Sequence, residues 1–399
     1  MFKPCKRLLL LCFVTTALSA PAYADENPAI VDLLLKNIER QTQIKPTFES
    51  AEEDSDGNVT ISNMSFKPAA GDTVMTVEEV SLEDVSDPED GMTTIGSATF
   101  SGIKIESKSA DGKPVTVEMP EGSVEEWYVK DAGDAPTPLD AVRASMTIAK
   151  KMSSGKVSIT SDGQTVTSDG YEATWDGDPA TGSGTWDAKV SSVVIPAALV
   201  ALADPSGTMK NLGYGDLTFS MTGGGKTTID ADNMGMDFNF TLAGKDMAAI
   251  KVAMNADKIP LAVYAELQKA QANGKEPDMQ AFMPQIQGIS FGGFSLRFED
   301  ASITPKLLPM IAAMSGMGTQ EQLVANAGAM AQVGLMQLNN PEFTNQVVGA
   351  INTFMKEPKS FTITLKPTAP VTVQQLSTMN PSDPGAAIKT LGVSVTAND

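Results

Sequence analysis

Apolar and polar residues alternate over much of the chain, and this period of two predicts a β-rich protein. In residues 46–130, apolar side chains recur at every second position, as with Val59 and Ile61 or Ile103 and Ile105. Clusters of Gly, Asp and Asn separate these runs, and such residues favour the tight turns of β-hairpins. We expect further strands in residues 156–195, four between 213 and 255, and others at 289–298, 361–365 and 393–395.

A period of three to four predicts helices between the strands. The first is expected over residues 28–41, where Ile30, Leu34 and Ile38 share one side. The second, over residues 137–155, would begin at the N-cap Thr137 and stop at Gly155. Its apolar stripe would consist of Leu139, Val142, Met146, Ala149 and Met152.

The remaining helices are indicated by composition and by capping residues. A brief buried helix is expected at residues 196–203, and a tight turn at Gly223-Gly224-Gly225. Residues 261–287 are expected to be helical with a break at Asn273-Gly274. Thr319-Gln320-Glu321-Gln322 has the form of a capping box. Asn340-Pro341 would start a further helix that Pro358 stops.

These patterns together predict an α+β fold, dominated by a long, twisted antiparallel sheet with packed helices. The N-terminal part is expected to be β-dominated and the C-terminal third to be mixed. We expect a signal peptide at 1–24, an N-terminal helix plus β-rich region at 25–136, a helix plus antiparallel β region at 137–257, and a mixed α+β region at 258–399.

The N-terminus has the three parts of a secretory signal. Lys3, Lys6 and Arg7 form a basic region, residues 8–18 are mostly apolar, and Ala22-Tyr23-Ala24 is an A-x-A cleavage site. We therefore expect export, cleavage after Ala24 and a periplasmic location. The longest later apolar run, residues 193–203, contains Pro196 and is too short to cross a bilayer. No membrane span is expected in the mature chain.

Missing residue types narrow the possible chemistry. The 399-residue chain has no histidine, and its two cysteines, Cys5 and Cys12, lie inside the predicted signal. Imidazole acid–base catalysis, Cys–His nucleophiles, His-ligated zinc and iron–sulfur clusters therefore have no ligands or bases here. We expect no catalytic, cofactor-binding or metal-binding residues, no cofactor, and a protein that is not an enzyme.

Charge is strongly negative and unevenly distributed. The net charge of −20 repels phosphate backbones, so a nucleic-acid partner is not expected. Between Glu49 and Asp90 there are 13 acidic residues and a single basic residue, Lys67. This block keeps a protein soluble and blunts edge strands; a surface for divalent cations or for a basic partner is the alternative.

Three motifs resemble known sites and also have structural interpretations. Ser153-Ser154-Gly155-Lys156 has Ser–Lys hydrolase spacing, but it falls at the expected end of a helix. Gly225-Lys226-Thr227 ends like a phosphate-binding loop, yet a strand is predicted after it. Glu52, Asp54 and Asp56 begin like a calcium loop without the closing Glu, which favours a hairpin. Glu299 and Asp300, at a strand end, are the carboxylates placed where a hydrolase site could form.

Aromatic and methionine residues are expected mainly in packing roles. Trp175 and Trp186 would face each other across a hairpin, with carbohydrate stacking as the alternative. Most methionines fall at core positions, including Met330. Met234-x-Met236 and Met314-x-x-Met317 have spacings that soft metal sites use. A methionine-rich interior would also suit an apolar ligand.

Three C-terminal segments carry a resemblance. Residues 294–304 read FSLRFEDASIT, residues 358–367 read PKSFTITLKP, and residues 391–398 read LGVSVTAN. They are similar to segments of uncharacterised secreted proteins of alphaproteobacteria, which implies a periplasmic protein and supplies no catalytic residues. The serial strands also resemble AsmA-like lipid-transfer proteins of the Gram-negative envelope, which implies a β-groove.

These observations predict a non-enzymatic periplasmic envelope protein that binds a hydrophobic, lipid-like ligand or an envelope protein. An apolar groove lined by Met, Leu, Val and Phe is the expected site. Two alternatives stay open: a structural scaffold protein with a filled core and no cavity, and a hydrolase that uses carboxylates or Ser–Lys.

Overall fold

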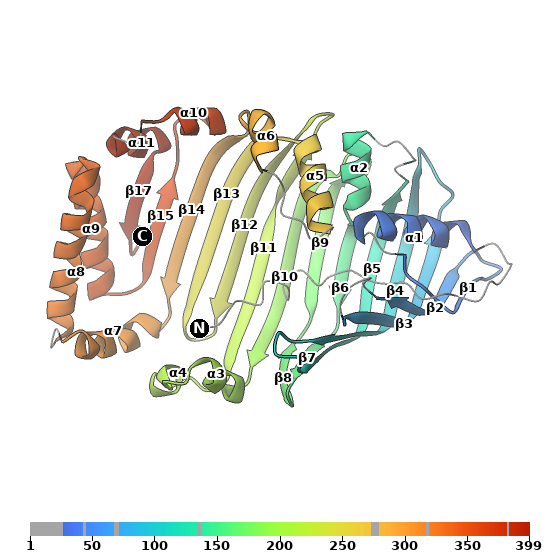
Figure 1. Ribbon diagram of the computed structural model, residues 1–399, viewed down its shortest axis with the longest axis horizontal. Helices are drawn as coiled ribbons and strands as arrows, with labels where there is room; N and C mark the ends of the chain where they lie inside the picture. Colours follow the sequence, from blue (N-terminus) through green and yellow to red (C-terminus); the bar gives the residue numbers. More distant parts are fainter. Residues whose placement is uncertain are drawn as a thin grey trace. The chain divides into compact units, whose positions relative to one another are not determined.

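The structure is a computed structural model that describes residues 27–42, 45–67, 72–131, 133, 137–272, 279–316, 319–380 and 383–399 (Figure 1). The expected signal peptide and its cleavage site lie outside these residues. The described chain is dominated by antiparallel strands and also contains several helices, which confirms a mostly-β α+β fold. Among the described residues, no helix combines the length and the apolar content needed to cross a membrane.

The chain forms two compact units that are interleaved in sequence. Unit 1 contains the described residues through Pro196, together with Thr228–Asp232 and Leu261–Ala281. Unit 2 contains Ala197–Thr227, Asn233–Pro260 and Phe282–Asp399. The division at residues 136 and 257 stays a prediction.

Unit 1 combines antiparallel strands with three helices. Strands β1 to β5 pair in chain order, and β5 also pairs with both β6 and β7. Its elements are α1 (Ala29–Thr42), β1 (Ser50–Glu53), β2 (Val59–Phe66), β3 (Val74–Val85), β4 (Met92–Lys108), β5 (Pro114–Lys130), α2 (Pro138–Ser145), β6 (Ile148–Ser154), β7 (Val157–Ser161), β8 (Gln164–Ser168), β9 (Tyr171–Asp178), β10 (Ser183–Ile195) and α5 (Leu261–Ala272).

The core of unit 1 lies between α1 and the strands β2 to β5. The predicted helical stripe of α1 faces this core: Ile30 and Leu34 are buried and Ile38 is partly buried, in one cluster with side chains such as Leu82 and Ile95. Period-two alternation in the strands supplies the other half of this core, because every second side chain points toward the helix.

The helix predicted over residues 137–155 is wrong in its second half. Thr137 caps α2 as expected, but α2 ends at Ser145 and the chain continues as β6. Ile148 and Ala149 are buried in β6, which pairs with β5 and β9. Burial between two strands outweighed a helical spacing that the sequence also satisfies.

Unit 2 contains long strands, several helices and the C-terminal strands. Strand β11 (Leu217–Ile229) and helix α6 (Met279–Ile286) belong mostly to this unit. Its elements are α3 (Ala197–Ala203), α4 (Thr208–Asn211), β11 (Leu217–Ile229), β12 (Asn233–Gly244), β13 (Ala248–Pro260), α6 (Met279–Ile286), β14 (Ser290–Asp300), α7 (Ile303–Met314), α8 (Gln320–Leu335), the 3₁₀ helix η1 (Met336–Leu338), α9 (Pro341–Lys356), β15 (Ser360–Leu365), β16 (Val371–Thr372), α10 (Val373–Thr378), α11 (Pro384–Leu391) and β17 (Val393–Ala397).

Two expectations for unit 2 are corrected. Residues 213–255 contain parts of three long strands instead of four short ones, and the three glycines lie inside β11 instead of in a turn. A Cβ atom on Gly225 would lie 2.0 Å from the Asp237 carbonyl oxygen, so this position needs glycine for close backbone approach. The helix α3 forms but contains no buried residue, and Leu202 is 65% exposed.

The predicted helix starts of unit 2 are confirmed. Thr319 and Gln322 form the capping box at the start of α8. Asn340 caps α9, with Pro341 in its first turn. The region 261–287 divides into α5 and α6, and the expected break at Asn273-Gly274 lies outside the described residues.

Candidate functional site

Five strands of unit 2 present one entirely apolar face. In the antiparallel order β12–β13–β14–β15–β17, directly opposed residues form straight rows, and side chains in one row point to the same side of the sheet. Three successive rows are apolar in every strand, and we call these fifteen residues the apolar face: Phe238, Phe240 and Leu242; Ile250, Val252 and Met254; Phe294, Leu296 and Phe298; Phe361, Ile363 and Leu365; Val393, Val395 and Ala397.

The opposite side of the same strands is polar and carries an ion-pair network. Arg297 Nε donates to Glu299 Oε1 at 2.8 Å, and Arg297 Nη1 lies 2.6 Å from Asp399 Oδ1. Lys251 Nζ lies 2.8 Å from Glu299 Oε2. Because the polar side chains are collected here, the two sides of the sheet differ sharply in chemistry.

Helix α9 covers one end of the apolar face. The ring of Phe354 makes edge contacts with Phe298 at 5.9 Å and with Phe361 at 5.8 Å between centroids. Val395 in β17 is buried beneath the same region. In Figure 1, α9 lies beside β15 and β17. Packing against a helix is the usual way in which an apolar sheet face is removed from water.

The rest of the apolar face remains in partial contact with water. In β12, β13 and β14 the face has eight residues besides Phe298, and none of these eight is fully buried; Phe298 itself is half-buried. Ile250 is 43% exposed and Leu296 is 36% exposed, although both lie in strands paired on either side. We call this part the open apolar face. It extends about 14 Å along the strands and ~10 Å across them. We take this part of the sheet as the candidate binding surface.

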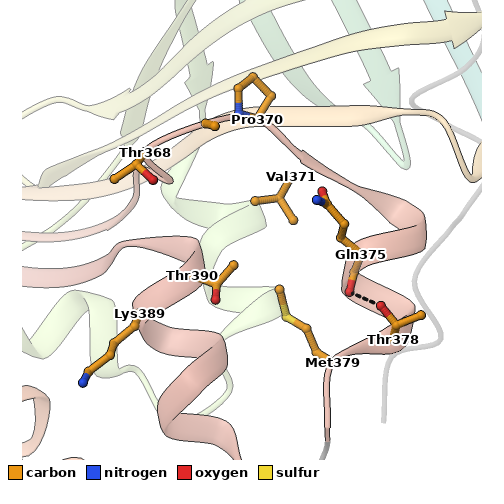
Figure 2. A pocket seen from close by; sticks show the side chains of 9 residues that line it. Thr368, Pro370, Val371, Gln375, Thr378, Met379, Lys389 and Thr390 are labelled. Carbon is orange, nitrogen blue, oxygen red and sulfur yellow. Dashed lines mark hydrogen bonds between the residues drawn. The ribbon is translucent and has the colours of Figure 1, made fainter.

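A pocket of about 530 Å³ lies at one end of the apolar face. It is formed by the chain before β16 and by helices α10 and α11 (Figure 2). Figure 2 shows Val371, Met379 and Thr390 around one space, while Lys389 extends outward from α11. The lining residues are Thr368, Ala369, Pro370, Val371, Gln375, Thr378, Met379, Lys389 and Thr390.

Strand register connects this pocket to the apolar face. Ala256 lies opposite Phe291, and Phe291 lies opposite Val371, which forms one further row. Ala256 and Met254 are two residues apart in β13, so they point to the same side of the sheet. Val371 therefore belongs to the same side as the apolar face and also lines the pocket.

The candidate hydrolase residues are engaged elsewhere. Ser153 lies in β6, and its hydroxyl is 2.8 Å from the hydroxyl of Ser123. The helix end predicted for this motif is therefore a strand end, which is a correction. Glu299 is in the polar network, where Lys251 and Arg297 lower its pKa, so it stays ionised instead of serving as an acid. Asp300 accepts a hydrogen bond from the Thr304 amide at 2.8 Å.

The calcium-like motif forms the predicted hairpin between β1 and β2. Asp54 accepts hydrogen bonds from the amides of Asp56 and Asn58 at 2.8 and 2.9 Å. The Asn58 side chain and these amides lower the pKa of Asp54. In the part of the chain that the structure describes, no group of three or more acidic or cysteine side chains is arranged to hold a metal ion.

The aromatic prediction is confirmed and the methionine prediction holds only in part. Trp175 and Trp186 are directly opposed in the β9–β10 hairpin. Met64 and Met234 are buried, but Met330, which was expected in the core, is 68% exposed on α8. Met317, the second residue of one candidate metal pair, lies outside the described residues.

The sequence contains the alternating apolar residues of this face but does not show that they lie side by side in the sheet. Each strand alternates visibly, but the rows depend on register, which a single sequence does not specify. The pocket has no sequence signal, because its lining residues come together only when the chain before β16, α10 and α11 fold against one another.

The comparisons with known proteins add one finding. A family described as "Uncharacterized protein" matches residues 241–398. This range includes the three segments that suggested an uncharacterised family, four of the five strands of the apolar face and the whole pocket. No curated protein matches the chain.

Proposed function

We propose that this chain is a non-enzymatic periplasmic protein that binds a hydrophobic, lipid-like ligand on the open apolar face. One observation carries the proposal: Phe, Leu, Ile, Val and Met side chains on three paired strands remain half-exposed on one side of the sheet. The opposite side of the same strands is polar, so the exposed apolar side chains are confined to one side of the sheet. The expected likeness to AsmA-like lipid-transfer proteins and the export signal agree with this proposal.

The energetics of such binding are favourable. Burying an apolar side chain contributes about 1.5–3 kcal/mol, so covering the exposed fractions of Ile250 and Leu296 contributes ~1 kcal/mol each. Each methylene of a ligand adds about 0.8 kcal/mol when it leaves water. Because association opposes this gain by at least ~4 kcal/mol, a long alkyl chain is required for tight binding.

A pair of aspartate variants on opposite sides of the sheet tests the proposal. Leu296→Asp places a charge on the open apolar face, and Ala253→Asp places one on the polar side, in the neighbouring strand. Both positions are exposed, so both variants should fold. The uncharged apolar fluorophore N-phenyl-1-naphthylamine is the probe, and native mass spectrometry of detergent-free protein detects co-purifying lipid.

We expect the wild type and Ala253→Asp to bind the probe equally and Leu296→Asp to bind it at least about tenfold more weakly. Equal probe binding by both variants, with circular dichroism unchanged, would refute this site. Absence of probe binding and of lipid in the wild type would refute the function itself.

A protein-binding function is the second candidate, and the outer side of α8 favours it. Met330 and Val333 of α8 and the adjoining Met336 of η1 are 68–70% exposed, and the single charged residue of α8 is Glu321 in its first turn. A second copy of this chain is the fitting occupant, because it carries the same uncharged apolar surface, whereas the chain as a whole has a charge of −20. Light scattering should then give a concentration-dependent dimer mass, which Val333→Glu abolishes and Gln332→Glu retains. A monomer mass at all concentrations would refute this candidate.

A further inference from the structure

The pocket between α10 and α11 differs chemically from the open apolar face beside it. Val371 and Met379 supply apolar surface, whereas Thr368, Gln375 and Thr390 supply polar groups. The open apolar face has no polar side chain at all. A ligand that spans both regions must therefore be amphiphilic, with its polar end in the pocket.

The polar groups of the pocket are mainly available as donors. Gln375 Oε1 already accepts a hydrogen bond from the Thr372 amide at 2.8 Å, so the side-chain NH₂ group remains for other partners. The hydroxyl of Thr378 already donates to helix carbonyls, including that of Gln375 at 3.0 Å, so its hydrogen is not available to a ligand. The hydroxyls of Thr368 and Thr390 complete the donor set of the lining.

The charges around the pocket also favour an anion. Among the described residues that line the pocket there is no carboxylate, and the charged residue is Lys389, whose side chain extends outward from α11. The acidic residue in the helix that carries Lys389 is Asp383, the N-cap of α11, whose Oδ1 accepts the Ala386 amide at 3.0 Å. It lies about 9 Å along the helix from Lys389. Residues 366–391 hold two lysines and one aspartate, whereas the whole chain has a charge of −20.

We infer that the α10–α11 pocket binds the anionic headgroup of an amphiphile whose alkyl chain lies on the open apolar face. This inference rests on the proposed function and adds the ligand class: a phosphate- or carboxylate-headed lipid. Phe291, which is paired with Ala256 and with Val371, lies in β14 between the open apolar face and the pocket. Hydrogen bonds to a charged group are about twice as strong as those between neutral groups, which is enough to select a headgroup.

Two ligands with equal chains and different headgroups test the inference. Calorimetry below the critical micelle concentration compares dodecyl phosphate with uncharged monododecanoylglycerol on the full mature chain. Inorganic phosphate alone separates a lipid headgroup from the free ion as the source of the anion. Lys389→Glu and Thr390→Asp alter the pocket. Lys359→Glu makes the same charge change at the other end of β15 and serves as the matched control.

We expect the wild type and Lys359→Glu to bind dodecyl phosphate at least about tenfold more tightly than the uncharged ligand. Lys389→Glu and Thr390→Asp should reduce this preference to about twofold or less, and inorganic phosphate should give no heat. Equal affinity for both ligands in the wild type, or tight binding of inorganic phosphate, would overturn the headgroup site while leaving the proposed function intact. Failure of both ligands to bind would instead overturn the proposed function.

Discussion

Arg143 provides the sharpest prediction about stability. This side chain is 1% exposed in α2, and its guanidinium connects separate segments of unit 1. Nε donates to the Pro179 carbonyl at 2.5 Å, and Nη2 donates to the Tyr128 carbonyl at 3.1 Å. Nη1 is buried and has no hydrogen-bond partner among the residues that the structure describes. Burial lowers the pKa of Arg143 to about 10, and the charge of Asp178 opposes this shift only partly.

The effect of replacing Arg143 on the free energy of unfolding has two opposing contributions. The two charged hydrogen bonds contribute about 3–6 kcal/mol together, and truncation to alanine adds a cavity. Removing the charge also removes the free-energy cost of burying it. The lowering of the Arg143 pKa from 12.5 to about 10 corresponds to a cost of about 3 kcal/mol. We expect Arg143→Ala to lower the free energy of unfolding by about 3–5 kcal/mol. Arg143→Met keeps most of the side-chain volume without the charge and should lower it by only ~1–2 kcal/mol.

Denaturant titration followed by tryptophan fluorescence measures both values in the relevant unit, because Trp127, Trp175 and Trp186 all belong to unit 1. Lys150→Ala, at an exposed position in β6, is the control and should change stability by less than about 1 kcal/mol. If Arg143→Ala unfolds at the wild-type midpoint, the two hydrogen bonds do not hold these segments together and the reasoning is wrong.

Three further outcomes follow from unit 2. Phe354→Ala should destabilise the protein by about 3–4 kcal/mol, because α9 loses its contacts with the apolar face. An unchanged unfolding midpoint in thermal circular dichroism would contradict this prediction. Gly225→Ala should cost more than about 2 kcal/mol in urea titrations, since its Cβ would collide with the Asp237 carbonyl. Hydrogen bonds from Thr396 and Arg297 lower the pKa of Asp399 to about 2, so its stabilising contribution is complete above pH ~4 and is lost as the pH falls through about 2. The stability difference between wild type and Asp399→Asn should shrink over that range, and a constant difference from pH 6 to pH 2 would contradict the assignment.

Local patterns predicted most of the elements. Alternation identified the strands of residues 46–130, and capping residues located the starts of α2, α8 and α9. These signals act within one turn or one strand, so they need no knowledge of partners. The error in residues 146–155 arose because the same apolar positions fit a helix stripe or a buried strand. Pairing with β5 and β9 decided between them.

The candidate site depended on information that is not local. Val252 and Leu296 face each other only because β13 and β14 pair in one register, and a shift by one residue would place Lys251 or Arg297 among the apolar side chains. The apolar groove lined by Met, Leu, Val and Phe stays a prediction. The sequence did not show which strands would leave such side chains exposed, because this depends on how far α9 extends over the sheet.

The open apolar face also bears on how the protein behaves in concentrated solution. Such a surface would pair readily with its equivalent on another molecule, and the charge of −20 opposes such encounters by long-range repulsion. Added salt shortens the range of this repulsion from about 10 Å at 0.1 M to ~3 Å at 1 M, while apolar attraction persists. The colloidal stability of the unliganded chain should therefore fall as ionic strength rises. When a ligand covers the open apolar face, the colloidal stability should no longer depend on salt.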